Sequence, residues 1–473
     1  MPLRRLAERR AHQRDRRGHD REGRPEEGVV LTTFTELPPG PSGLLSARPG
    51  PDLEAAGYVE REYVATGTAV SYRGDQPPDG HWSLDVGGEA AFVTRLVVRR
   101  PESPGAFSGT VVAEWLNVSS GADAAPDWTY LADEIVRRGH AWVGVSAQHV
   151  GVEGGAAAVV SGFEQEGLKA DPRHAALRHP GDAFAYDIFS SVVAGLAGPG
   201  PLSDLDVTVR LAVGESQSAY ALTTYANGVQ PLVRLFDGFL IHSRGGAAMP
   251  LGEPGRAVDL AIFRTNEPTW VRDDLDVPVV MVQTEGDLTG RLRYLPARQP
   301  DAERLRLWEV AGTAHADKYQ IGEFEDLLGC PLPVNRGQQA FVVRAALRHL
   351  DTWARGGPAA PSAERLEVED GAFVLDEHGN ARGGVRTPVV DAPVDRLRGD
   401  TLPDASVICE LFGSTLPMDP ARLAELYADP GAYLAAYEIA TDGAIAAGFV
   451  LAEDRAEVLA EARPELVPNP THI

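Results

Sequence analysis

A serine stands in the strongest chemical signal of the sequence, the motif GESQS (214–218). The motif follows the apolar run VTVRLAV (207–213) and precedes the alanine-rich run AYALTTYAN (219–227). A strand that turns sharply into a helix through G-x-S-x-G raises the serine hydroxyl clear of the sheet, where it can attack a carbonyl carbon. The turn requires small residues two positions before and after the serine, and a glycine and a serine occupy them. Ser216 is therefore the candidate nucleophile.

A serine hydroxyl needs a base to take its proton, and that base must itself be oriented. In the strand–turn–helix arrangement the chain order is serine, acid, histidine. His315 lies in the small-residue loop GTAHAD (312–317), directly after the predicted strand LRLWEV (305–310). The other downstream histidines lie before any candidate acid, inside a predicted helix, in a turn, and beside the last residue: His242, His349, His378 and His472. We therefore predict that His315 is the base.

The acid of such a triad follows the strand before the histidine, here PVVMVQT (278–284). Two carboxylates stand there in TEGDL (284–288), Glu285 and Asp287. An acid a few residues past the strand end favours Asp287. Glu285 stays open as the alternative; otherwise it would support the site from behind or cap the turn.

Two backbone N–H groups normally bind the oxyanion of the reaction, one from the residue after the nucleophile and one from the loop after the third strand. The first of these residues is Gln217. The loop reads WLNVSSG (115–121), so the second donor is predicted to be the Val118 N–H or the Asn117 side chain.

The motifs EWLNVSSGADAAPDW, GESQSA, IHSRGGAA, TEGDL and GTAHAD together resemble a bacterial family known only as alpha/beta hydrolase domain-containing proteins. The resemblance runs from about residue 30 to the end of the chain. It implies the α/β-hydrolase fold and a triad of Ser216, a TEGDL carboxylate and His315, and it names no substrate. In IHSRGGAA (241–248), His242, Ser243 and Arg244 either line the pocket or form a plain turn.

The elements that must position these residues alternate between strand and helix. Near-continuous apolar runs are typical of strands covered on both faces, and their alternation with helical segments favours an α/β fold with a mostly parallel central sheet flanked by helices. Predicted strands include 58–64, 91–98, 110–116 and 141–147, and predicted helices include 184–198 and 338–356. We predict a disordered basic tail over 1–28 and a catalytic domain over 29–356.

The remaining segment, 357–473, is predicted to be a C-terminal helical extension packed on the catalytic domain. It begins with a Gly/Pro-rich stretch and a hairpin near 376–380, and continues as three short helices over 419–462, with a break expected at Asp442–Gly443. These helices carry an apolar face that includes Tyr427, Tyr433 and Tyr437. We expect the extension to contact the mouth of the active site at least partly; plain structural packing is the alternative.

Composition narrows the function classes. The 473 residues carry a formal net charge of −24, which repels nucleic acid and anionic membrane surfaces, and no apolar run reaches the ~18 residues of a membrane span. The N-terminus lacks the apolar region of a secretory signal. Two distant cysteines, Cys330 and Cys409, indicate unpaired thiols in a reducing compartment. We therefore expect a cytoplasmic protein with no nucleic-acid or membrane partner, no metal and no cofactor; its oligomeric state is left open.

The function expected from these residues is hydrolysis of a small-molecule carboxylic ester through an acyl-enzyme on Ser216. Amide or thioester hydrolysis and acyl transfer use the same groups and stay open. A different class, a binding protein that keeps the fold without the chemistry, is disfavoured by the intact order of serine, acid and histidine.

Overall fold

A nine-stranded sheet organises the computed structural model, which describes residues 32–44, 46–159, 168–261 and 266–469. The strand order is β1-β2-β3-β5-β4-β6-β7-β8-β9. The pairs β1–β2, β2–β3 and β3–β5 are antiparallel. All later pairs in this order, from β5–β4 to β8–β9, are parallel. Their bounds are β1 Thr33–Glu36, β2 Tyr58–Asp75, β3 Ser83–Pro101, β4 Thr110–Trp115, β5 Ala141–Val145, β6 Val209–Glu215, β7 Gly238–His242, β8 Val279–Thr284 and β9 Leu305–Val310. The prediction of a mostly parallel sheet flanked by helices is confirmed.

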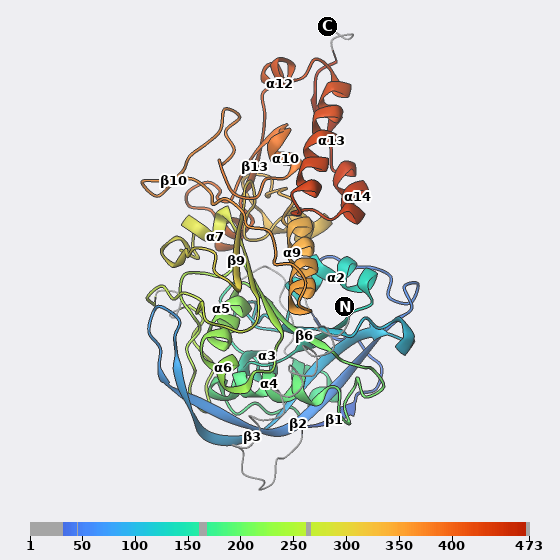
Figure 1. Cartoon of the computed structure of the whole chain (residues 1–473), viewed down its shortest axis with the longest axis vertical. Helices are drawn as coiled ribbons and strands as arrows, with labels where there is room; N and C mark the ends of the chain where they lie inside the picture. The colour runs from blue at the N-terminus through green and yellow to red at the C-terminus, as the bar shows by residue number, and fades with distance from the viewer. Residues whose placement is uncertain (1–31, 45, 160–167, 262–265, 470–473) are drawn as a thin grey trace, which may run out of the picture. The chain divides into compact units, whose positions relative to one another are not determined.

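Helices cover both faces of this sheet (Figure 1). On one face α2 (Pro126–Arg138) and α9 (Gln339–Ala354) bury their apolar stripes against the central strands. On the other face α4 (Ala185–Gly195) and α5 (Gln217–Thr224) do the same. Both faces of the parallel strands are therefore apolar, which explains their near-continuous hydrophobic sequences. Among the described residues, no helix is long and apolar enough to cross a membrane.

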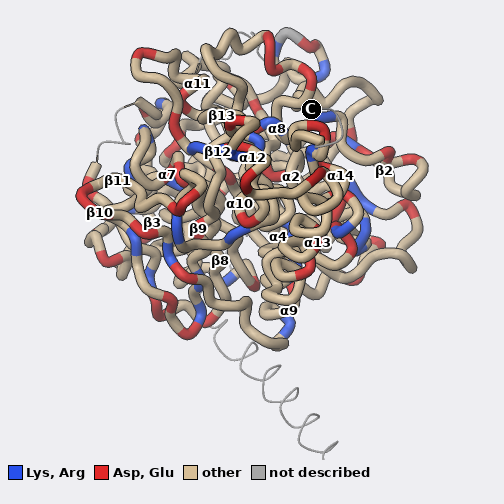
Figure 2. Tube along the Cα trace, turned by 90° about the horizontal axis from the view of Figure 1, so that it is seen from above, with Lys and Arg blue, Asp and Glu red and all other residues tan. Residues whose placement is uncertain are grey.

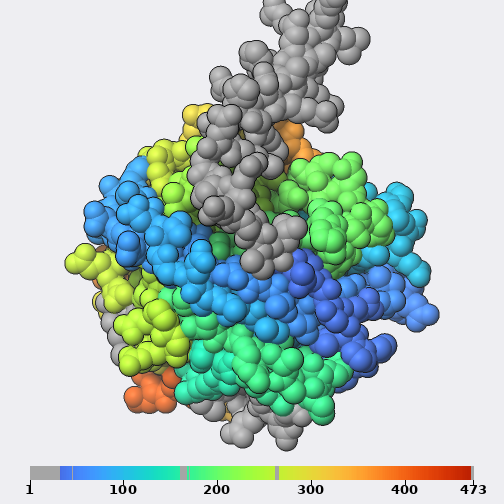
Figure 3. All heavy atoms as spheres, turned by 90° about the horizontal axis from the view of Figure 1, so that it is seen from below, coloured from blue at the N-terminus to red at the C-terminus, as the bar shows by residue number. Residues whose placement is uncertain are grey.

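The β2–β3 hairpin is far longer than the predicted strands at 58–64 and 91–98, because each strand continues through alternating polar residues that face solvent. In Figure 3 it runs in blue across one face of the molecule, beside the green segment that contains α4. The Asp187 carboxylate of α4 accepts the Val70 N–H and the Tyr72 hydroxyl, which ties α4 to the hairpin.

The C-terminal extension packs on the sheet domain beyond β9 and α9. Its elements are β10 Val368–Glu369, β11 Ala372–Phe373, α10 Pro388–Asp391, β12 Asp395–Arg398, α11 Val407–Phe412, β13 Ser414–Pro417, α12 Pro420–Leu426, α13 Pro430–Ala446 and α14 Arg455–Ala460. Figure 2 shows α11, β12 and β13 close to α8 (Lys318–Ile321), with acidic and basic residues interspersed over this face. The break expected at Asp442–Gly443 is absent, because α13 runs through it to Ala446.

The two cysteines form a disulfide, which corrects the prediction of unpaired thiols. Cys330 and Cys409 are 79 residues apart in sequence, and their Cα atoms lie 5.5 Å apart. The extension folds back onto the loop after α8, and this long-range contact leaves no local trace in the sequence. The argument for a reducing compartment, which rested on unpaired thiols, therefore loses its support. The predicted tail over 1–28 lies outside the described residues.

Candidate active site

Ser216 lies at the sharp turn between β6 and α5. Its backbone has φ 59° and ψ −119°, a region that a residue with a side chain rarely occupies. The Ser216 N–H donates to the His242 carbonyl of β7 at 2.9 Å, which fixes the turn to the neighbouring strand. A Cβ atom on Gly214 would lie 3.0 Å from the Cβ of Ser218, so both positions must stay small.

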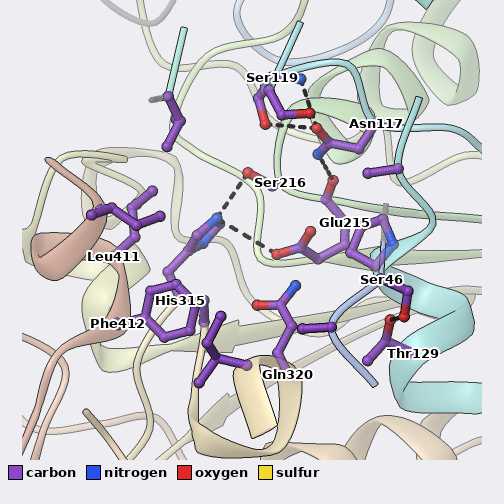
Figure 4. Close-up of a pocket in the computed structure, with 18 of the residues that line it drawn as sticks. Ser46, Asn117, Ser119, Thr129, Glu215, Ser216, His315, Gln320, Leu411 and Phe412 are labelled. Atoms are coloured by element: carbon purple, nitrogen blue, oxygen red, sulfur yellow. Dashed lines mark hydrogen bonds and ion pairs between the residues drawn. The ribbon is translucent and has the colours of Figure 1, made fainter. Parts of the chain in front are cut away.

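His315 and Asp287 extend from Ser216 in a hydrogen-bonded line. The Ser216 Oγ lies 2.8 Å from His315 Nε2, and His315 Nδ1 lies 2.7 Å from Asp287 Oδ1. Asp287 is the third residue of α7 (Glu285–Thr289), and its other oxygen accepts the Thr284 N–H at 2.7 Å. Since a carboxylate accepts the Nδ1 proton, Nε2 is left with its lone pair directed at the serine hydroxyl. Figure 4 shows His315 beside Ser216.

Glu285, the alternative acid, does not contact His315 in this arrangement. Its two carboxylate oxygens accept the backbone N–H groups of Gly312 and Gly399, at 2.5 and 3.1 Å. Glu285 therefore ties α7 to the histidine loop and to the C-terminal extension. Burial raises the pKa of this carboxyl to about 7.

The predicted oxyanion donors are partly engaged. Gln217 is the first residue of α5, so its N–H has no acceptor within the helix. The Val118 N–H donates to the Gln217 side-chain oxygen at 3.2 Å. The Asn117 side chain donates to the Glu215 carbonyl at 3.1 Å and accepts from the N–H and hydroxyl of Ser119. Asn117 thus fastens the loop to the turn at Ser216, and the Val118 N–H is engaged by the Gln217 carboxamide.

Glu215, mentioned in the sequence only as part of the motif, lies within the site. Its Oε1 is 3.6 Å from His315 Nε2, and the residue is 4 % exposed. Burial, together with nearby carboxylates such as Asp127 and Asp287, raises the pKa of Glu215 well above its usual value. Burial therefore disfavours the charged form of this carboxyl beside His315.

Ser216 and His315 open into a cavity of about 410 Å³. One side is polar, with Asn117 and Ser119 above Ser216 and with Ser46, Thr129 and Gln320 on the side away from Leu411 (Figure 4). The other side is apolar and is formed by residues that lie in or after the histidine loop or belong to the extension. These are Ala316, Ile321, Phe324, Leu328, Ile408, Leu411 and Phe412.

Sequence reasoning missed this apolar side because its residues converge only through the long-range fold. The extension does reach the mouth, as expected, but through α11 rather than through its tyrosines. Tyr427, Tyr433 and Tyr437 are buried in a separate cluster with Phe341 of α9.

The IHSRGGAA segment does not line the cavity either. His242 is fully buried beside Asp127, with Nδ1 3.0 Å from a carboxylate oxygen. The Arg244 guanidinium is buried and donates hydrogen bonds to the Thr223 hydroxyl and the Thr269 carbonyl. Of the two interpretations left open for this segment, these contacts favour a structural turn.

Comparison with known proteins agrees with this architecture. A family model described as an alpha/beta hydrolase domain matches residues 30–460. Comparison with curated proteins gives no significant match.

Similar solved structures include three hydrolases. A serine hydrolase without a lid from Xanthomonas campestris is 12% identical, with 62% of this chain and 97% of that one covered and a TM-score of 0.30. A fungal esterase from Rhizomucor miehei is 13% identical, with 62% and 85% covered and a TM-score of 0.31. A cold-adapted esterase from an Arctic intertidal metagenomic library is 12% identical, with 54% and 84% covered and a TM-score of 0.29.

Proposed function

Since the chain belongs to the alpha/beta hydrolase family, whose model covers residues 30–460, we propose that it is a serine hydrolase that cleaves carboxylic esters. The observation that carries this proposal is the line of hydrogen bonds from Ser216 through His315 to Asp287, at 2.8 and 2.7 Å. This line ends at a cavity large enough for a small organic molecule.

In the proposed reaction His315 Nε2 takes the Ser216 proton while Oγ attacks the acyl carbon. Asp287 holds the imidazole in the required tautomer and stabilises the imidazolium that forms. The imidazolium then gives its proton to the leaving alcohol, and the acyl group stays on Ser216. A water molecule, deprotonated by the same nitrogen, releases the acid and restores the serine.

The oxyanion formed in each half-reaction is assigned to the Gln217 N–H. The Val118 N–H is the second donor and becomes available when the Gln217 side chain turns away from it. An oxyanion binds such donors more strongly than a neutral carbonyl does, so the exchange of the Gln217 oxygen for the substrate oxygen is favoured in the transition state.

The direct test is the Ser216→Ala variant. Hydrolysis of p-nitrophenyl butyrate should fall by ~10⁴–10⁶-fold, because the nucleophile is lost, and a fluorophosphonate probe should label only the parent protein. Ser243→Ala is the matched control, since Ser243 is also buried, has a φ of 53° and does not line the cavity. It should keep both activities.

Full hydrolysis by purified Ser216→Ala would overturn the nucleophile assignment. A parent protein that neither labels nor turns over any ester, amide or thioester would instead favour the binding protein considered above. Parallel assays with anilide and thioester substrates decide among the acyl-transfer reactions that share these groups.

A further inference from the structure

The apolar side of the cavity is built by two segments that a disulfide joins. The first is the 3-10 helix η8 (Gly322–Leu328), which contributes Phe324 and Leu328. The second is α11 of the extension, which contributes Ile408, Leu411 and Phe412. We refer to η8 and α11 together as the apolar wall. Cys330 lies two residues after η8 and Cys409 lies within α11, so the disulfide links the two halves of this wall.

Backbone hydrogen bonds hold α11 against the histidine loop and against Asn335 as well. The Ala316 N–H, next to His315, donates to the Leu411 carbonyl at 3.0 Å, and the Asn335 N–H donates to the Phe412 carbonyl at 2.9 Å. Apolar groups presented by α11 therefore lie at a fixed position relative to His315. Figure 4 shows Leu411 and Phe412 beside His315, away from Ser46 and Thr129.

The wall also offers no counter-ion. Among the described residues that line the cavity there is no lysine or arginine, and the Glu215 carboxyl lies beside His315 rather than on η8 or α11. A charged acyl or alcohol group would lose its hydration there without gaining a partner, which is costly. The site is suited to a neutral substrate.

We propose that the wall formed by η8 and α11 is a subsite for a bulky apolar group of a neutral ester, and that the Cys330–Cys409 disulfide holds this subsite in shape. The inference rests on the proposed ester hydrolysis and specifies its substrate class. An apolar side chain against Phe324, Leu411 and Phe412 adds transition-state binding that a short ester does not obtain. The cysteines are positioning residues, since they act through the wall.

The test compares long and short esters in two series. One series varies the acyl group, p-nitrophenyl octanoate against acetate, and the other varies the alcohol, octyl acetate against ethyl acetate. The parent protein should prefer the long member of one series in kcat/KM, and that series identifies which part of the ester occupies the wall. An octanoate analogue whose chain ends in a carboxylate should lose this preference.

Leu411→Asn and Phe324→Asn should each lower the long-to-short ratio of kcat/KM by about tenfold, because each removes one apolar contact. Leu327→Asn is the matched control. Leu327 is 65 % exposed on the same 3-10 helix and does not line the cavity, so its ratio should stay at the parent value.

The disulfide is tested by the double variant Cys330→Ser with Cys409→Ser and by reduction of the parent protein. Both should raise KM for the long ester severalfold with little change in kcat, and a reductant should have no further effect on the double variant. A simple loss of stability would instead lower Tm and affect both esters equally, which would overturn the role given to the disulfide.

An unchanged long-to-short ratio in Leu411→Asn and Phe324→Asn, with normal fluorophosphonate labelling of Ser216, would overturn the subsite while leaving ester hydrolysis in place. A parent protein that is not labelled and turns over no ester would overturn the proposed function itself.

Discussion

Asp287 and Glu285 lie two residues apart on one short helix, yet their carboxylates face different partners. Asp287 meets the imidazole and Glu285 meets two backbone N–H groups. The separation follows from the start of α7: the Thr284 N–H fixes the carboxylate of the third residue, whereas the side chain of the first residue points to the histidine loop. Sequence alone favoured Asp287 only by its distance from the strand end.

This geometry predicts that Asp287→Asn and Glu285→Gln differ in how far they lower kcat. Asp287→Asn should lower kcat by ~10⁴-fold, because an amide neither stabilises the imidazolium nor enforces its tautomer. Glu285→Gln should lower kcat far less, since its carboxyl does not contact His315. Ester turnover and urea unfolding, measured on both variants, separate the two effects.

Glu285→Gln should lose stability instead. Its NH₂ group would face a backbone N–H, and an unsatisfied buried donor costs about 1–3 kcal/mol. If Glu285→Gln is the variant with the larger loss of kcat, the acid of the triad is Glu285 and the assignment of Asp287 is wrong.

At the scale of elements, the sequence predicted those features that depend on residues close together in the chain. The strands 207–213 and 305–310 are rich in apolar residues because most of their side chains are buried, and the small residues around Ser216 follow from the turn itself. The disulfide, the apolar wall and the engagement of the Val118 N–H were not predictable. Each depends on segments that meet only when the extension folds back or when loops pack.

Gly399 of the extension lies directly against α7. A Cβ on Gly399 would lie 2.3 Å from the Gly286 nitrogen and 2.6 Å from the Glu285 Cβ. Gly399→Ala should therefore displace α7 and with it Asp287. A displacement of ~1 Å in a catalytic group can cost ~10²-fold in rate, so kcat and the rate of fluorophosphonate labelling should both fall by that order.

Gly443→Ala is the matched control in the same extension. An added Cβ there meets no atom within 4 Å, and the residue lies inside α13. Alanine in a helix interior should leave activity unchanged and raise stability by up to about 1 kcal/mol. Equal activity in the two glycine variants would show that the extension does not position the acid.

Over the whole molecule, the buried acids and histidines set opposing dependences of stability on pH. Burial raises the pKa of Glu285 to about 7 and of Asp317 to about 6. Stability from such groups is fully present below the unfolded pKa, near 4, and is lost as pH rises through the folded pKa. Burial lowers the pKa of His140 and His179 to about 4, so their contribution is present above about 6.5 and lost as pH falls.

Because these contributions overlap, the pH dependence of one group is isolated by comparing a variant with the parent protein. Glu285→Gln removes one group that binds a proton more tightly in the folded state, with its pKa raised from 4.5 to about 7. The unfolding free energy should therefore decrease less from pH 5 to pH 8.5 in Glu285→Gln than in the parent, by up to about 3 kcal/mol. Urea unfolding at the two pH values measures it, with the exposed Glu364→Gln as control. The same pH difference in Glu285→Gln and the parent would show that Glu285 is not protonated preferentially in the folded protein.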